Sequence, residues 1–179
     1  MATAYSKIQR NFWETDEARE MTPEEKYFWM YLQTNANVNT LGCYAFRMRK
    51  AMDETGYNRE TLEKLLQRME QVLRILYDEG TKEVFLLHWA EGNWNKKTAT
   101  LRALAADLKE IQSKTLKETV KTLLLKNGIF TEEEVEKAEK TAPSAQERNE
   151  KEQRGTTGNK RSGEGEGEGE GEGEGEGET

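Results

Sequence analysis

The sequence predicts a mainly helical α+β protein, and three observations support this fold class. A helical segment over residues 47–55 is separated from a second helix, which begins at Arg59, by the tripeptide at 56–58. Gly56 of this tripeptide can take the positive φ of a turn, and Asn58 can cap the next helix. A short apolar run over 42–46 precedes the two helices, and β-type residues follow over 72–89. This order of elements predicts a winged helix-turn-helix.

The segment before this unit supplies the first helix of the core. Residues 7–20 contain Ile8, Phe12 and Trp13, which are enough to dock a short strand or turn onto a domain. Thr22-Pro23-Glu24-Glu25 then provides a cap, a proline at the first helical position and acidic residues in the first turn. We expect the aromatic-rich helix that follows to end in the Asn-rich loop over 34–40.

The second helix of the turn motif has one apolar stripe, and two β-type runs come after it. The apolar positions recur at the i, i+3, i+4 and i+7 spacing of a helix face buried on one side; they are Leu62, Leu65, Leu66 and Met69. The β-type runs cover residues 72–77 and 83–89. The polar link over 78–82 between them contains glycine and has hairpin length.

Further helices are expected after the hairpin. One carries a stripe formed by Leu101, Leu104, Ala105, Leu108 and Ile111; others are expected over 114–125 and 131–140, the last opening with the capping box Thr131-Glu132-Glu133-Glu134. From residue 142 onward the composition predicts disorder. We therefore divide the chain into a winged helix-turn-helix domain (1–92), carboxy-terminal helices (93–141) and a disordered linker and Gly-Glu repeat tail (142–179).

The net charge of −7 over 179 residues is a property of the tail. A strict Gly-Glu alternation from Gly163 contains eight glutamates, and without them residues 1–162 carry 27 basic and 26 acidic residues. The single cysteine, Cys43, falls in the apolar strand and predicts a buried thiol in a reducing compartment. No signal-peptide core or membrane span of about 20 apolar residues is visible, so we expect a cytoplasmic protein.

The residues that carry a family resemblance are spread in order over 7–111. They are Asn11-Phe12-Trp13, the helix start at Thr22-Pro23-Glu24-Glu25-Lys26, Tyr31-Leu32 with Thr34-Asn35, Asn39 before Gly42, Thr55-Gly56, Met69-Glu70, Tyr77, and Asn93-Trp94 with Lys97. In these positions the chain resembles the amino-terminal domain of Gram-positive phage replisome organisers, the DnaD-like replication initiators. The chain departs from that family at Lys97-Thr98, where the family has Asn-Pro, and no sequence like the family's second domain follows Lys126.

The resemblance implies a winged helix in a protein that starts phage or prophage DNA replication, binds origin DNA and helps to load the helicase. The expected partners are double-stranded DNA, with single-stranded DNA as an alternative, a helicase loader or other replication protein, and further copies of the chain. No membrane, cofactor or metal is expected, nor an enzymatic activity. The alternatives on the same scaffold are a transcriptional regulator and an assembly adaptor that contacts only protein.

The candidate DNA-binding residues belong to the helix-turn-helix and the hairpin. Those expected to read bases or contact the groove are Arg59, Lys64, Gln67 and Arg68; those expected on phosphates are Arg47, Arg49, Lys50 and, at the wing tip, Lys82. Glu60 and Glu63 lie on or beside the same helix face, and residues 42–91 hold 8 basic against 9 acidic residues. Because this segment has almost no net positive charge, the helix could instead serve for protein contact or dimerisation.

Three other features each allow two interpretations. Residues 93–128 carry a net charge of +5, from 8 basic and 3 acidic residues, which suits a solvated helix face or a phosphate-tracking surface. Trp89 and Trp94 either pack the hairpin onto the next helix or stack on single-stranded bases. The Gly-Glu repeat is either a solubilising appendage or a competitor that folds back on the basic segment. The single His88 lacks the partners of a triad or a zinc site.

Overall fold

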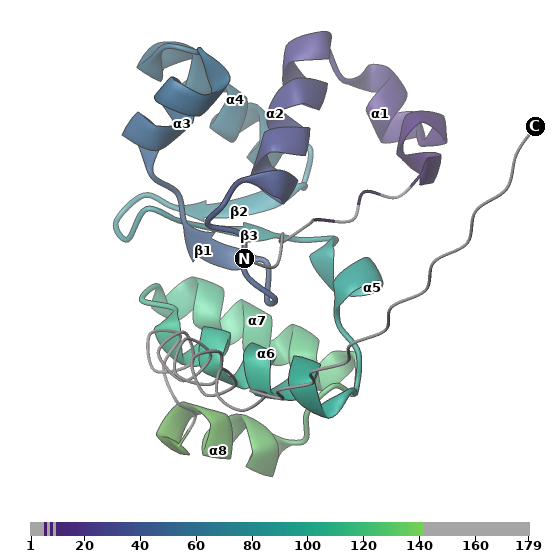
Figure 1. Ribbon diagram of the computed structural model, residues 1–179, viewed down its shortest axis with the longest axis vertical. Helices are drawn as coiled ribbons and strands as arrows, with labels where there is room; N and C mark the ends of the chain where they lie inside the picture. The colour runs from purple at the N-terminus through teal and green to yellow at the C-terminus, as the bar shows by residue number, and fades with distance from the viewer. Residues whose placement is uncertain (1–5, 7, 9, 142–179) are drawn as a thin grey trace, which may run out of the picture.

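The computed structural model describes residues 6, 8 and 10–141, and Figure 1 shows helices on both sides of a small antiparallel sheet. The mainly helical α+β class predicted from the sequence is confirmed. The elements are η1 (Arg10–Glu14), α1 (Asp16–Glu20), α2 (Pro23–Thr34), β1 (Cys43–Ala45), α3 (Met48–Thr55), α4 (Arg59–Gln71), β2 (Ile75–Asp78), β3 (Glu83–Leu86), α5 (Trp89–Asn93), α6 (Thr98–Glu110), α7 (Lys114–Lys126) and α8 (Glu132–Thr141).

The sheet has the strand order β1-β3-β2, and both pairs of strands are antiparallel. The central strand β3 is buried along its whole length, with Val84 opposite Tyr44 on one side and opposite Tyr77 on the other. In Figure 1 the helices α2, α3 and α4 lie on one side of the sheet and α6, α7 and α8 on the other. Strand β2 packs against both α4 and α7, so the sheet is the middle layer between two groups of helices.

The start of α2 is fixed by a capping box, at the residue where the sequence predicted a cap. The Thr22 hydroxyl accepts a hydrogen bond from the Glu25 backbone N–H at 3.2 Å, and a Glu25 carboxylate oxygen accepts one from the Thr22 N–H at 2.8 Å. Both groups satisfy backbone donors that have no partner within the helix. Phe28 and Leu32 of the same helix are fully buried and tie it to the core.

Helices α3 and α4 follow one another along the chain, at the positions where the sequence predicted two helices separated by a turn. Gly56 ends α3 in the left-handed conformation, with φ +77°, and the Asn58 side chain accepts a hydrogen bond from the Thr61 N–H at 2.9 Å. The four residues of the expected apolar stripe are all buried: Leu62, Leu65, Leu66 and Met69. The opposite face of α4 is consequently left for solvent.

All three strands are shorter than the predicted runs. The first covers Cys43–Ala45 rather than residues 42–46. The second begins at Ile75 rather than residue 72, because α4 extends to Gln71 and Leu73 turns the chain with a positive φ of 51°. The third ends at Leu86 rather than residue 89, because Trp89 begins the short helix α5.

The amino-terminal segment docks through only one of its three large apolar side chains. Phe12 is buried, whereas Ile8 is 38% and Trp13 62% exposed. The segment is a 3-10 turn followed by a short helix, and Trp13 packs edge-on against Phe12 with the ring centres 5.2 Å apart.

The carboxy-terminal helices share one hydrophobic cluster with the rest of the described chain. Leu104 and Leu108 of α6 are fully buried, and α8 packs on α6 with Val135 and Ala138 buried. The cluster therefore continues across the domain boundary placed at residue 92, and that boundary stays a prediction. The expected linker and tail at 142–179 lie outside the described residues.

Candidate nucleic-acid interface

The solvent-facing side of α4 is the natural centre of a candidate interface. Helix α4 packs against α2, α3 and β2 through its apolar stripe. The residues that remain exposed include Glu60, Glu63, Lys64, Gln67 and Gln71. This face holds acidic, basic and amide side chains together, so its charge is nearly balanced.

Ion pairs within the helix account for that balance. Arg59 lies 3.5 Å from Glu63, and Lys64 lies 2.7 Å from Glu60, each pair at the i, i+4 spacing. The Lys64 hydrogen bond lowers the pKa of Glu60, which keeps this carboxylate ionised. Exposed pairs of this kind contribute little to stability, so a phosphate can exchange for the carboxylate at small cost.

Arg68 differs from the other candidates because it bonds to another helix. Its Nε–H donates to Glu25 at 2.9 Å, and the Glu25 side chain is 10% exposed whereas that of Arg68 is 44% exposed. The pair joins α4 to the start of α2. The structure thus gives Arg68 a positioning role, in addition to the base-reading role expected from the sequence.

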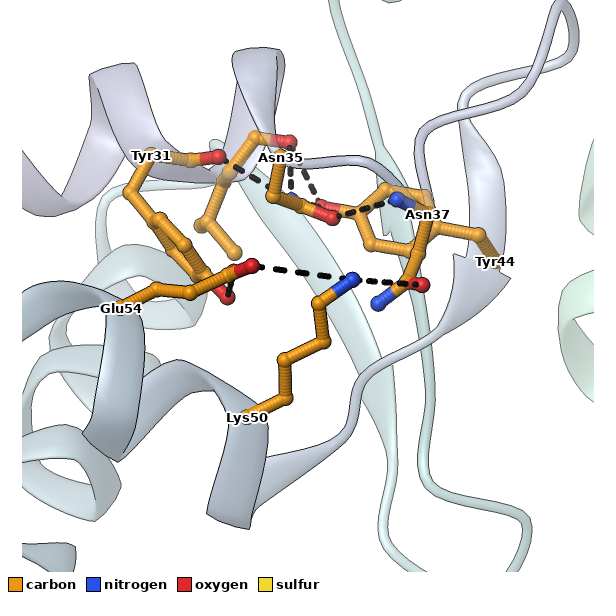
Figure 2. A network of polar contacts seen from close by, with 7 residues as sticks. Tyr31, Asn35, Asn37, Tyr44, Lys50 and Glu54 are labelled. Atoms are coloured by element: carbon orange, nitrogen blue, oxygen red, sulfur yellow. Dashed lines mark hydrogen bonds and ion pairs between the residues drawn. The ribbon is translucent and has the colours of Figure 1, made fainter.

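A polar network holds α3 against the end of α2, as Figure 2 shows. The Tyr31 hydroxyl donates to Glu54 at 2.8 Å, and Lys50 lies 3.7 Å from Glu54 and donates to Asn37 at 3.5 Å. Burial is the main cause that raises the pKa of Tyr31 above its usual range, so the phenol remains protonated and able to donate. Lys50 is therefore part of the support of α3.

The same network continues from the Asn-rich loop to strand β1. The Asn35 side-chain amide donates to the Tyr44 hydroxyl at 3.0 Å, and this hydroxyl donates to the Leu32 carbonyl at 2.6 Å. Burial raises the pKa of Tyr44 above its usual range, so its proton is retained. Helix α3 is thus held in one orientation relative to α2 and the sheet (Figure 2).

Arg47 and Arg49 are the two candidates whose charges are available. Arg47 is the N-cap residue of α3 and Arg49 lies in its first turn, and both are exposed. Within the described part of the chain neither side chain makes a hydrogen bond or an ion pair. Two unpaired guanidinium groups at one helix start are suited to phosphate contacts.

The hairpin tip carries Lys82 as predicted, in the left-handed conformation with φ +58°. Its ammonium lies 3.8 Å from Glu79, so this cation is also partly compensated. The tip is shaped by Asp78, whose carboxylate accepts hydrogen bonds from the N–H groups of Gly80 and Thr81 at 2.8 and 3.1 Å.

The base of the hairpin is braced by the start of α7. The buried Glu83 carboxylate accepts hydrogen bonds from the backbone N–H groups of Gln112, at 3.0 Å, and Ser113, at 2.7 Å. The Ser113 hydroxyl donates to Asp78 and is the main cause that lowers the pKa of that carboxyl. The start of α7 therefore helps to set the position of the β2–β3 hairpin, a link that no sequence signal indicated.

Trp89 and Trp94 pack in the protein interior. Trp89 and Trp94 are both 8% exposed, and their indole N–H groups donate to the carbonyls of Thr40, at 3.0 Å, and Leu41, at 3.3 Å. Neither ring is available to stack on bases in this conformation. His88 is exposed, and its Nδ1 lies 3.5 Å from Glu91.

Gln71 also belongs to the exposed face of α4, although it was not among the DNA-binding residues predicted from the sequence. Gln71 lies one helical turn beyond Gln67, and both amides are exposed without a hydrogen-bond partner among the described residues. Glutamine can pair with the adenine edge through two hydrogen bonds. The sequence does contain a signal for Gln71, because Gln67 and Gln71 lie four residues apart and both fall outside the apolar stripe.

Comparisons with protein-family models, curated proteins and solved structures found no match. None of the described helices is long and apolar enough to cross a membrane. The function is therefore proposed from the geometry of α3, α4 and the hairpin together with the sequence resemblance.

Proposed function

We propose that the protein binds duplex DNA through a winged helix-turn-helix formed by residues 22–87. The observation that carries this proposal is the outer face of α4. Its residues are exposed while its apolar stripe is buried, and the unpaired Arg47 and Arg49 lie at the start of the neighbouring helix α3. A helix presented in this way, with flanking cations, has the form of a major-groove reader.

The contacts divide into two groups. Arg47 and Arg49 bind phosphates, and Lys82 adds a contact from the hairpin tip. Gln67 and Gln71 reach base edges, while Arg59 and Lys64 exchange their intrahelical carboxylates for DNA groups. Phosphate contacts fix the position of the protein on the duplex, and contacts to base edges give sequence preference.

The biological role proposed for this DNA binding is the initiation of phage or prophage replication, on the strength of the sequence resemblance described above. A replication partner such as a helicase loader belongs to the same proposal. A transcriptional regulator would use the same groove contacts. Neighbouring genes for a helicase loader or a single-strand-binding protein would favour the replication role.

A second candidate is an assembly adaptor that binds protein rather than DNA. The near neutrality of the α4 face favours it, since Glu60 and Glu63 neutralise Lys64 and Arg59. Nucleic-acid affinity depends strongly on uncompensated cations, whereas a mixed polar face can suit a protein partner.

The experiment measures duplex binding by fluorescence anisotropy at low salt. A preferred sequence is first selected from a random pool and then compared with random DNA. We expect Gln67→Ala to weaken binding to the preferred sequence by about 1–3 kcal/mol and to leave random DNA unaffected. An absence of duplex binding by the wild type, with the fold intact by circular dichroism, would reject the proposal in favour of the adaptor.

A further inference from the structure

Two tyrosines meet on the surface, where α2 faces the turn between α3 and α4. Tyr27 of α2 is 47% exposed, and Tyr57, in the turn, is half-buried. Their rings pack edge to face, with the centres 5.8 Å apart and an angle of 71° between the ring planes. Nearly half of the Tyr27 surface thus remains in contact with solvent.

A carboxylate lies beside this aromatic pair. Glu24 precedes Tyr27 by three positions in α2, the spacing that places both side chains on one helix face. Burial raises the pKa of Tyr57, and the negative charge of Glu24 adds to the increase, so the Glu24 carboxylate acts electrostatically on the Tyr57 hydroxyl. Among the described residues the Glu24 side chain makes no hydrogen bond or ion pair. We refer to Glu24, Tyr27 and Tyr57 as the tyrosine–glutamate patch.

The surroundings of the patch are negative. The last turn of α3, which leads into Tyr57, holds Asp53 and Glu54 and no basic residue. Glu54 is partly compensated by Lys50 at 3.7 Å, whereas Asp53 has no ion pair within the described part of the chain. The end of a helix also carries a partial negative charge, which favours cations. This part of the surface is therefore suited to a positively charged ligand.

The cations nearest in sequence to the patch are directed elsewhere. Arg59 lies 3.5 Å from Glu63 and opposes the rise that burial causes in the pKa of Tyr77, so its guanidinium lies on the hairpin side of α4. Lys26 follows Glu24 by two positions, which places it about 200° around the axis of α2. The patch thus combines an exposed aromatic ring with a carboxylate that these cations do not neutralise.

We propose that the tyrosine–glutamate patch binds an arginine side chain presented by a partner protein. A guanidinium can stack on a tyrosine ring and at the same time donate two parallel hydrogen bonds to a carboxylate. The ammonium of lysine lacks this planar fork, so the patch prefers arginine. The negative surroundings repel the phosphates of a nucleic acid, and the patch is therefore a protein-binding site separate from the DNA contacts proposed for α4.

Nuclear magnetic resonance of the isotope-labelled full chain tests this binding, with acetyl-Gly-Gly-Arg-Gly-Gly-amide as the probe. We expect the peptide to shift the backbone amide signals of Tyr27 and Tyr57 in a saturable manner. The same peptide with citrulline, which is planar but neutral, should shift neither signal. A lysine peptide should bind about two- to fivefold more weakly, the effect of losing an exposed stacking contact. Only signals of the patch are compared, because the Gly-Glu tail also carries carboxylates.

Tyr27→Phe and Tyr27→Leu form a matched pair of variants. The phenylalanine keeps the ring and should retain binding, whereas the leucine should weaken it by about two- to fivefold. Glu24→Gln should remove the preference for the arginine peptide over the citrulline peptide. As a control, Trp13→Leu removes another exposed ring, on η1, and should leave the binding unchanged.

Three results would overturn the proposal. They are equal shifts with the arginine and citrulline peptides, equal losses in the two Tyr27 variants, and no saturable shift at the patch in the wild type. A single-stranded oligothymidylate that shifted the same signals would identify a base-stacking site instead and would also overturn it. The peptide titrations contain no DNA, so their outcome is independent of whether the protein binds a duplex.

Discussion

The Nε–H of Arg68 donates to a carboxylate oxygen of Glu25 at 2.9 Å, and this ion pair connects α4 to the start of α2. The other oxygen of Glu25 accepts the Thr22 N–H and closes the capping box. One nearly buried carboxylate thus caps one helix and orients another. The position of the face proposed to bind DNA depends on this contact.

We expect Glu25→Ala to destabilise the protein by about 1–3 kcal/mol, because the cap is lost and the Thr22 N–H and Arg68 lose their acceptor. Urea denaturation followed by circular dichroism measures this change. Arg68→Ala should cost less, since its side chain is 44% exposed and the capping box survives. Equal losses for the two variants would contradict the double role of Glu25.

Gly42 and Gly56 form a matched pair for a test of close packing. Both have φ +77°, but a Cβ at Gly42 would lie 2.4 Å from Trp89 Cγ, whereas a Cβ at Gly56 meets nothing within 4 Å. We expect Gly56→Ala to cost about 1–2 kcal/mol for the left-handed backbone, and Gly42→Ala to cost about 1–3 kcal/mol more because Trp89 must move. Similar melting temperatures for the two variants would contradict the close packing of Trp89 against Gly42.

The pKa of Asp78 is held below its usual range, chiefly by the hydrogen bond from the Ser113 hydroxyl. A carboxyl with a lowered pKa in the folded state stabilises the fold above its unfolded pKa, and this contribution is lost as the pH falls through the folded pKa. We therefore expect stability to decrease below about pH 4, the ordinary pKa of Asp. Asp78→Asn should flatten this part of a pH series of urea midpoints. If the urea midpoint of that variant fell below pH 4 as steeply as that of the wild type, Asp78 would not brace the hairpin.

Structural features that depend on residues within one helix or turn could be predicted from the sequence. The Thr22 cap, the Gly56 turn and the apolar stripe of α4 depend on residues at most seven positions apart, and the structure contains all three. The strand ends were predicted wrongly, because Leu73 turns the chain before β2 and Trp89 begins α5 after β3. The Trp89 indole N–H donates to the Thr40 carbonyl, 49 positions away, and a contact at such a separation is not specified by local sequence patterns.

The same distinction applies to the candidate site. The pairs of Arg59 with Glu63 and Lys64 with Glu60 follow the i, i+4 rule, so the weak charge of α4 could be anticipated. Arg68 bonds to a residue 43 positions away, and Glu83 bonds to Ser113 across 30 positions. Such contacts depend on how α2 and α7 pack, which local sequence patterns do not specify.

The salt dependence of duplex binding tests the central claim most directly. Each phosphate neutralised contributes about 0.9 to the slope of log K against log salt, so Arg47→Ala and Arg49→Ala should each reduce the slope by about one. Both variants should weaken binding equally on preferred and random duplexes. Arg102→Ala, which removes an exposed arginine from α6, should leave the slope unchanged. Wild-type slopes in the Arg47 and Arg49 variants would contradict DNA binding at the α3–α4 face.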